Sequence, residues 1–214
     1  GMYDEGLEVT QDYKEAVKWW RRAAEQGYVH AQYNLGMMYY TGEGVTQDHK
    51  ETAKWYRLAA EQGHMRGQYN LGGMYYQGEG VTQDYKEAAK WYQLAAEQGS
   101  ARAQYELGFM YEKGNGVKQD KKEAVRFYRL AAEQGDAWAQ NNLGIMYSLG
   151  AGVIYDQVSA HMWHNIAASN GNRFAEDNRA TLAGQMTPSQ LEEATRLARE
   201  FEENQRLVSG ASIH

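Results

Sequence analysis

The sequence predicts an all-α protein, a solenoid of stacked helix-turn-helix repeats with a C-terminal capping helix. Three observations support this prediction: a period of 36 residues, helical spacing of apolar residues within each period, and glycines where the helices should end. A fixed period of about 20–50 residues is typical of arrays in which each unit packs on its neighbours. Positions that recur at this period include Val9, Val45, Val81, Val117 and Val153, and Asp12, Asp48, Asp84, Asp120 and Asp156.

The first helix of each unit, the A helix, is expected at Val29–Thr41 in the first full unit. Ala31, Leu35, Met38 and Tyr39 are spaced i, i+4, i+7 and i+8, which is helical periodicity and not strand periodicity. Glycines that follow Thr41 end the helix and turn the chain.

A glycine lies inside every full A helix, although it costs about 1 kcal/mol relative to alanine. It recurs as Gly36, Gly72, Gly108 and Gly144. This recurrence predicts a steric need, because a neighbouring helix would pass too close for a Cβ atom. A second site holds only small residues, which also predicts close helix contact: Ala31, Gly67, Ala103, Ala139 and Ala175.

The second helix, the B helix, is expected at Asp48–Gln62. Asp48 is a good N-cap, and Glu51 completes an Asp-x-x-Glu variant of the capping box. Gly63 is expected to release the chain into the next A helix. The predicted buried stripe is Thr52, Trp55, Tyr56, Ala59 and Ala60, and the predicted solvated convex face is Lys50, Lys54, Arg57 and Glu61.

The terminal units are atypical. At the N-terminus, Glu8 replaces the glycine of the other loops, and at the C-terminus residues 172–185 form a degenerate A-type helix. Thr187, Pro188 and Gln190 then form a helix-start signal. We therefore predict a repeat domain over 1–185, a capping helix over 186–206 and a loose tail over 207–214. The capping helix proper is expected at Pro188–Gln205, with the buried stripe Leu191, Ala194, Leu197, Ala198 and Phe201.

Composition narrows the functional classes. The chain has no cysteine, which excludes disulfides, thiolate metal ligands and a cysteine nucleophile. A formal net charge of −6 disfavours a nucleic-acid-binding surface. The sequence has no apolar run long enough to predict a membrane span, and no signal peptide is visible. Gly1 lies in the middle of a unit, as it would in a trimmed chain. The sequence leaves the location open between the cytoplasm and, if a leader was removed, the periplasm or the exterior.

The pattern A-x-x-x-L-G-x-x-Y-x-x-G-x-G-V-x-x-D-x-x-x-A-x-x-W-Y-x-x-A-A-x-x-G over residues 2–171 resembles the Sel-one-like repeat, a relative of the tetratricopeptide repeat. One copy carries it as Leu71, Gly72, Tyr75, Gly78, Gly80, Val81, Asp84, Ala88, Trp91, Tyr92, Ala95, Ala96 and Gly99. The resemblance implies a right-handed superhelix with A helices on the concave side. It also implies an adaptor role, commonly bacterial, and it leaves the partner unnamed.

Sites that vary between copies on one face of the A helices are the candidate binding residues. The face is aromatic with interleaved Arg and Asn, and Tyr, Trp and Arg are enriched at binding hot spots. The predicted partner-binding residues are Tyr33, Tyr40, Arg66, Tyr69, Asn70, Tyr76, Arg102, Tyr105, Phe109, Glu112, Trp138 and Asn142. The tyrosines could instead pack, half-buried, between neighbouring helices.

The predicted function is a non-enzymatic scaffold that binds a peptide or helix of another protein in its concave groove. The expected state is a monomer, with self-association as the alternative. A carbohydrate-binding module is the alternative, because aromatic rings with Asn and Glu can stack sugars. A hydrolase acting through Glu106 and Glu112 is a weaker hypothesis, since no base–nucleophile pair supports it. His161 and His164 have metal-ligand spacing without a third ligand nearby in sequence, so we expect a surface or packing role for them, with no metal and no cofactor.

Overall fold

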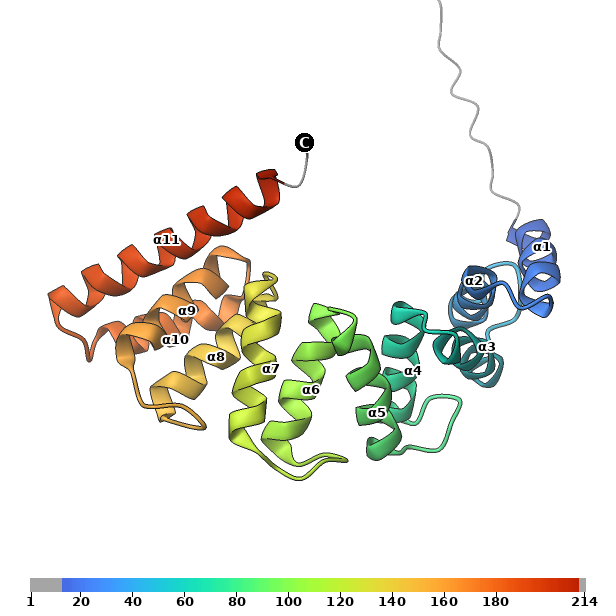
Figure 1. Cartoon of the computed structure of the whole chain (residues 1–214), viewed down its shortest axis with the longest axis horizontal. Helices are drawn as coiled ribbons and strands as arrows, with labels where there is room; N and C mark the ends of the chain where they lie inside the picture. The colour runs from blue at the N-terminus through green and yellow to red at the C-terminus, as the bar shows by residue number, and fades with distance from the viewer. Residues whose placement is uncertain (1–12, 212–214) are drawn as a thin grey trace, which may run out of the picture. The chain divides into compact units, whose positions relative to one another are not determined.

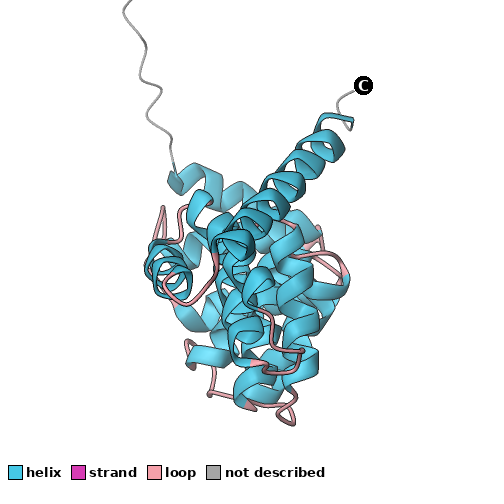
Figure 2. Ribbon diagram, turned by 90° about the vertical axis from the view of Figure 1, so that its left-hand side faces the viewer, coloured by secondary structure: helices cyan, strands magenta, loops and turns pink. Residues whose placement is uncertain are grey.

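A computed structural model describes residues 13–211, and within that range it contains α-helices joined by loops and no strand (Figure 2). The helices, labelled in Figure 1, are α1 (Tyr13–Glu25), α2 (Val29–Thr41), α3 (His49–Glu61), α4 (Met65–Gln77), α5 (Tyr85–Glu97), α6 (Ala101–Lys113), α7 (Lys121–Glu133), α8 (Ala137–Leu149), α9 (Gln157–Ser169), α10 (Arg173–Ala183) and α11 (Pro188–Ala211). The predictions that concern Glu8, Val9 and Asp12 lie outside the described residues. Among the residues described, no helix is long and apolar enough to cross a membrane.

The chain forms two compact units, Gly1–Asp84 and Tyr85–His214. In the first unit, α1 packs on α2, α2 on α3 and α3 on α4. In the second unit, the same order continues from α5 to α9, and both α10 and α11 pack on α9. Consecutive packing of this kind is the arrangement predicted for a helical repeat array, whereas the predicted single repeat domain over 1–185 stays a prediction.

Helix boundaries follow the sequence signals closely. Helix α2 spans the predicted Val29–Thr41, and α3 begins one residue after its N-cap, Asp48. The Asp48 carboxylate accepts hydrogen bonds from the backbone N–H groups of Lys50 and Glu51. Asp120 and Asp156 cap α7 and α9 in the same way. The N-cap prediction is therefore confirmed for these three B helices, but the capping box is not formed, because the backbone N–H of Asp48 donates to the Tyr39 carbonyl and not to Glu51.

The glycine inside the A helix has the predicted steric cause, although a ring rather than a helix backbone is the obstacle. A Cβ atom on Gly36 would lie 2.7 Å from the Tyr56 ring of the same hairpin. On Gly108 it would lie 2.6 Å from the Tyr128 ring. On Gly144 it would lie 2.8 Å from the ring of His164, the residue that replaces the aromatic. These three hairpins each seat one large ring of the B helix on bare A-helix backbone.

One prediction about the B-helix surface is wrong. Arg57, expected on a solvated face, donates a hydrogen bond to the Tyr75 hydroxyl of the next A helix, and its guanidinium lies over that ring. Arg129 donates to the Tyr147 hydroxyl at 2.8 Å in the same manner. The arginine side chain is long enough to reach the next A helix. The sequence of the B helix alone does not reveal this contact.

A row of buried glutamines, which the sequence reading missed, also joins the hairpins. Gln104 is 5% exposed, and its amide donates to the Ala96 carbonyl oxygen of the preceding B helix at 3.2 Å. Its own oxygen accepts a hydrogen bond of 2.7 Å from Gln134, at the end of the next B helix. Gln140 repeats this pattern with Asn170 as its donor, at 2.9 Å. These side chains satisfy one another across repeats, so they can be buried without a large desolvation cost.

The C-terminal helix starts as predicted, because Thr187 and Gln190 form a reciprocal capping box. Ala194 and Ala198 are buried, and the Phe201 ring meets Trp163 of α9 edge-on at 5.0 Å. The predicted end is wrong: the helix continues past Gln205 to Ala211, so 207–211 is not a loose tail. Extending a formed helix costs far less than starting one, and periodicity is not needed for extension.

Candidate functional site

The variable A-helix residues fall into two groups, one in each unit, which we describe separately. The unit-1 face consists of Tyr33, Tyr40, Arg66, Tyr69, Asn70 and Tyr76. The unit-2 face consists of Arg102, Tyr105, Phe109, Glu112, Trp138 and Asn142. Tyr40, Arg66, Arg102 and Trp138 are exposed, and the other eight are half-buried. No residue of either face belongs to the buried core.

The unit-1 face is built around Tyr56, a buried ring of α3. Tyr33 of α2 stacks on it with ring centroids 5.5 Å apart and an interplanar angle of 22°. Asn70 of α4 is hydrogen-bonded to the Tyr56 hydroxyl, and burial raises the pKa of Tyr56 well above its usual range. A single B-helix ring thereby fixes side chains from two successive A helices. The half-buried tyrosine Tyr33 packs on α3 as well as facing solvent, so it is partly a structural residue.

Cationic and imidazole groups border the unit-1 face. The His64 ring lies 4.5 Å from the Tyr33 ring and 5.3 Å from the His30 ring. Burial, followed by the nearby His30 and Arg66, lowers the pKa of His64. Its Nδ1 accepts a hydrogen bond from the backbone N–H of Gly67, so the ring also caps α4. Sequence reasoning missed His64 because a histidine at an N-cap reads as a loop residue.

The unit-2 face repeats this plan around Tyr128 with different charges. The Tyr105 ring of α6 lies 6.0 Å from the Tyr128 ring, and the Tyr128 hydroxyl donates a 2.8 Å hydrogen bond to Glu112. Asn142 of α8 is hydrogen-bonded to both tyrosine hydroxyls. Burial first, and then the bond to Glu112, raises the pKa of Tyr128 far above its usual range. The phenol is therefore a donor held in one orientation.

Carboxyl groups set the electrostatics of the unit-2 face. Burial and the nearby Asp136 raise the pKa of Glu106 to about 7. Burial and the nearby carboxyl groups of Glu106, Asp136 and Glu112 raise the pKa of Tyr105 to about 12. A raised carboxyl pKa is one property of a general acid, but buried structural acids share it. Glu106 and Asp136 are contributors to this face that lie outside the predicted set.

The other three predicted residues of this face differ in burial: Phe109 packs against the core cluster that contains Tyr128, whereas Trp138 and Arg102 are exposed. Trp138 is 51% exposed and packs at 5.7 Å on Phe174 of α10. Phe109 is half-buried, and the Lys113 ammonium lies 5.6 Å above its ring. Arg102 is exposed near the start of α6. The unit-2 face therefore has a fixed centre at Tyr105, Glu112 and Asn142 and a separate aromatic pair, Trp138 with Phe174.

The two histidines with metal-ligand spacing are buried in α9. The His164 ring nitrogen Nδ1 lies 3.1 Å from the Asn141 oxygen Oδ1, and burial, with His161 close by, lowers the pKa of His164 to about 4. His161 is 6% exposed, and burial followed by Arg179 lowers its pKa too. Over the described range, no group of three potential ligands is arranged to hold a metal ion. Both rings fill the core of the last hairpin.

The consecutive hairpins, the ring seated on glycine and the bridging glutamines define a helical-repeat protein of the α-solenoid class. The family model described as Sel1 repeat matches residues 1–28, 29–64, 66–100, 101–136 and 139–172. The chain therefore belongs to the Sel1 repeat family, as the resemblance implied.

Solved structures agree with this assignment. A protective antigen of uropathogenic Escherichia coli with an SLR fold is 39% identical, with a TM-score of 0.82 over 93% of this chain. This chain spans only 43% of the length of that protein. A Sel1 repeat protein from Oxalobacter formigenes is 38% identical, with a TM-score of 0.78 over 92% of this chain and 83% of its own. No curated protein matches the chain.

Proposed function

We propose that this protein is a non-enzymatic interaction scaffold that holds an extended peptide or a helix of a partner protein on its A-helix faces. Sel1 repeat proteins are generally protein-interaction scaffolds, which supports the class. The main support for the proposal is that each A helix contains two kinds of position, recurring and variable. The leucine, methionine and glutamine that recur in every full A helix are buried, whereas the twelve candidate residues keep exposed surface of the types enriched at interfaces.

The arrangement of both faces supports recognition of a defined segment. Each face has an aromatic ring and an amide group fixed by contacts to a buried tyrosine, and the unit-2 face also has the fixed carboxylate of Glu112, so the ordering cost of these groups is met before binding. The charges differ, with Arg66 and histidines on the unit-1 face and Glu112 with Glu106 on the unit-2 face. We expect a partner segment on the unit-1 face to be acidic or neutral, and one on the unit-2 face to carry a basic side chain.

The test begins with a displayed-peptide selection on the full chain, followed by calorimetry of the enriched peptides. Tyr40→Ala with Arg66→Ala tests the unit-1 face, and Arg102→Ala with Trp138→Ala tests the unit-2 face. All four side chains are exposed, so the variants should fold. We expect at least a tenfold loss of affinity in one pair, because interface anchors of these types contribute about 1–3 kcal/mol each.

The matched control is Leu58→Ala with Leu94→Ala, two exposed apolar residues at equivalent sites on B helices. This control should retain full affinity. Peptides that bind both A-face variants as well as the unaltered protein, or that lose binding only in the control, would remove the A-helix faces as the binding surface.

A carbohydrate-binding module remains a second candidate because of the Trp138–Phe174 pair. Both rings are about half exposed, at 51% and 46%, and sugars stack on exposed aromatic faces. Binding on a glycan array that disappears with Trp138→Ala and Phe174→Ala would favour this function. Silence of the array, with retained peptide binding, would exclude it.

A further inference from the structure

The loop between α8 and α9 differs from the equivalent loops in its side chains. We name residues 149–156 the fourth loop, after the loops 41–48, 77–84 and 113–120. Where the first three have Thr, Gln or Lys, the fourth loop has Leu149, Ile154 and Tyr155. These three side chains are 70%, 89% and 55% exposed. Single exposed apolar residues are ordinary, but three on one short loop form a patch.

The backbone of the fourth loop is held in place, so the patch does not result from a loose segment. The Ala151 N–H donates to the Met146 carbonyl at 2.9 Å, and the Asp156 N–H donates to the Tyr147 carbonyl at 3.1 Å. Gly152 adopts a φ of +75° and is seated so closely on α7 that a Cβ atom would lie 2.3 Å from the Lys121 carbonyl oxygen. The apolar side chains therefore stand on a fixed frame.

The position of Tyr155 is occupied in the other three loops by a glutamine that has a structural role. The side-chain amides of Gln47, Gln83 and Gln119 donate at 2.7–2.8 Å to the carbonyl oxygens of Tyr40, Tyr76 and Glu112. These bonds tie each loop to the end of its A helix. Tyr155 occupies the same position in the fourth loop and has an exposed ring. The fourth copy thus has an aromatic surface where the others have a loop-closing hydrogen bond.

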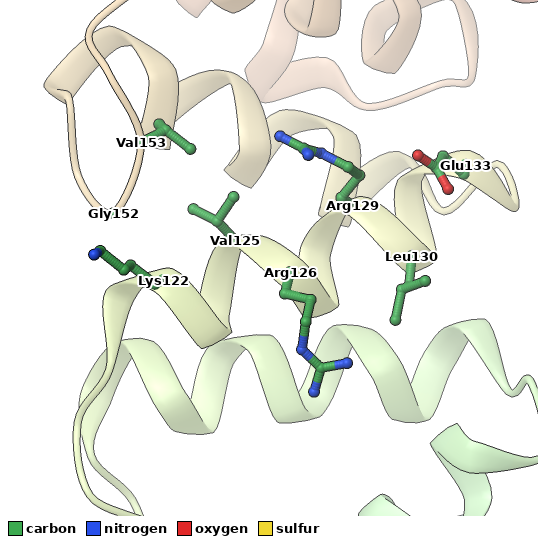
Figure 3. Close-up of a pocket in the computed structure, with 8 residues that line it drawn as sticks. All are labelled: Lys122, Val125, Arg126, Arg129, Leu130, Glu133, Gly152 and Val153. Atoms are coloured by element: carbon green, nitrogen blue, oxygen red, sulfur yellow. The ribbon is translucent and has the colours of Figure 1, made fainter.

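Two hollows adjoin the patch. The first, of about 340 Å³, lies between α7 and the fourth loop, and Figure 3 shows Val125 and Val153 pointing toward one another across it. The second, of about 480 Å³, is lined by Tyr147, Val153, Ile154, Tyr155 and Asp156. Val153 belongs to both, and Arg129 of the first hollow donates to the Tyr147 hydroxyl of the second. The two hollows therefore meet under the fourth loop.

The first hollow is mainly cationic. Lys122, Arg126 and Arg129 line it together with a single carboxylate, Glu133. Arg126 forms an ion pair with Glu123 at 2.8 Å, and Arg129 uses one of its five N–H groups on Tyr147. This local excess of positive charge stands out in a chain with a net charge of −6. It favours a negatively charged ligand group beside an apolar one.

The first unit contains a hollow equivalent to the second of these two, and it lacks the apolar rim. It is lined by Thr46 and Gln47 where the fourth loop has Ile154 and Tyr155, and its charged groups, Arg21, Lys54, Asp48 and Glu51, are balanced. The repeat frame therefore provides the hollow and also cations, which recur on other B helices as Lys50, Lys54 and Arg57, and the residue changes of the fourth copy add the apolar rim.

We propose that the fourth loop and the adjoining face of α7 form a second docking surface, separate from the A-helix faces, for an acidic amphipathic segment of a partner protein. Apolar side chains of the segment cover Leu149, Ile154 and Tyr155, and its carboxylates lie against Lys122 and Arg129. Charge complementarity selects an acidic segment, and the adjoining hollows receive its apolar side chains.

The experiment is a displayed-peptide selection on the full chain, counter-selected against the variant Leu149→Thr, Ile154→Thr, Tyr155→Gln. These substitutions install residues found in the other loops, so folding should be unaffected, which circular dichroism checks. We expect enriched peptides that combine apolar residues with Asp or Glu. Their affinity, measured by fluorescence polarisation, should fall at least tenfold in the triple variant and at least threefold in Lys122→Glu, and should weaken with added salt.

Two control measurements make the proposal falsifiable. The A-face variants of Tyr40, Arg66, Arg102 and Trp138 should bind the same peptides unchanged, so that failure of the proposed A-face function and failure of this surface can be told apart. Enrichment of basic peptides, equal binding to the triple variant, or no enrichment overturns the proposal. So does loop-dependent binding to phosphatidylglycerol vesicles without peptide binding, which would make the patch a membrane contact.

Discussion

The hairpins α6–α7 and α8–α9 lie in the same unit and follow the same 36-residue plan, yet they use different chemistry at its centre. In the first, the Tyr128 ring sits on Gly108 and its hydroxyl donates to Glu112. In the second, the His164 ring sits on Gly144 and is bonded to Asn141. The position above the glycine therefore requires a flat ring of suitable size, whereas the polar group that bonds to this ring can differ between hairpins.

The same two hairpins also differ in the loop that joins their A helix to their B helix. Gln119 ties the loop before α7 to the Glu112 carbonyl, whereas Tyr155 leaves the loop before α9 without that side-chain bond. Both loops nevertheless keep the glycine that seats them on the preceding B helix, Gly116 and Gly152. Backbone contacts are thus retained where side chains have diverged. Four predictions test this division between a shared frame and variable polar groups.

The largest effect is expected at the loop glycines that both hairpins share. A Cβ atom on Gly116 would lie 2.1 Å from the Tyr85 carbonyl oxygen, and φ is positive there, as at Gly152. Gly116→Ala and Gly152→Ala should each lower the free energy of unfolding by more than about 3 kcal/mol, because left-handed strain adds to a backbone clash. Urea denaturation followed by circular dichroism measures this.

Gly135→Ala is the matched control, because Gly135 has a φ of +88° and no atom within 4 Å of the added Cβ. This variant should lower the free energy of unfolding by only about 1–2 kcal/mol, the contribution of backbone strain alone. Equal losses in all three variants would show that close seating of the loop contributes nothing.

The second effect is a loss of stability in acid that belongs to the α8–α9 hairpin. The pKa of His164 is about 4 in the folded protein, below the ordinary value of 6.5. The unfolded chain therefore takes up the proton first, and stability falls as the pH drops from about 6.5 to about 4. A shift of this size corresponds to about 3 kcal/mol.

His164→Tyr installs the ring that Tyr128 provides in the other hairpin and should flatten the pH dependence in that window. Denaturation midpoints at a series of pH values compare the two proteins, and the smaller contribution of His161 should remain in both. An unchanged pH profile would mean that His164 is not held neutral by the fold.

The third effect has the opposite sign and belongs to the α6–α7 hairpin. The pKa of Glu106 is raised to about 7, so its carboxyl costs the folded state stability as the pH rises from about 4.5 to about 7. Glu106→Asn copies Asn142 at the equivalent position and should raise the free energy of unfolding by about 1–2 kcal/mol at neutral pH or above, with no change near pH 4. Glu133→Gln, an exposed acid of α7, is the control and should show no such pH-dependent gain.

The smallest effect concerns the loop-closing glutamine. Gln119→Ala removes the hydrogen bond to the Glu112 carbonyl and should destabilise the protein by about 0.5–1.5 kcal/mol. Tyr155→Gln offers the fourth loop the same bond and should change stability by less than about 1 kcal/mol, in the stabilising direction. Thermal unfolding midpoints suffice, and a lower midpoint for Tyr155→Gln would show that the Tyr155 ring stabilises its own loop.

Helix positions and caps could be predicted because they depend on neighbours in sequence. Asp48 caps α3 through N–H groups two and three residues away, and Gly36 indicated a close contact by its position alone. The site was predicted less completely. Exposure of Tyr40, Arg66 and Trp138 followed from helix periodicity, but the carboxyl of Asp136 approaches Tyr105 from the N-cap of α8, which no local pattern encodes.

By itself, the sequence determined the repeat family, the helix boundaries within the repeats and the residues that vary between copies, because these depend on spacing along one chain. Only the tertiary structure decided that Gln104 is buried in a chain of amides, that Arg57 reaches Tyr75, and that His164 stays neutral at acidic pH. It also decided that Trp19 is 59% exposed while Trp55, at the same repeat position, is 5% exposed. The physical reason is that burial and pKa are set by atoms of neighbouring helices, so the same residue in the same local pattern can have a different environment.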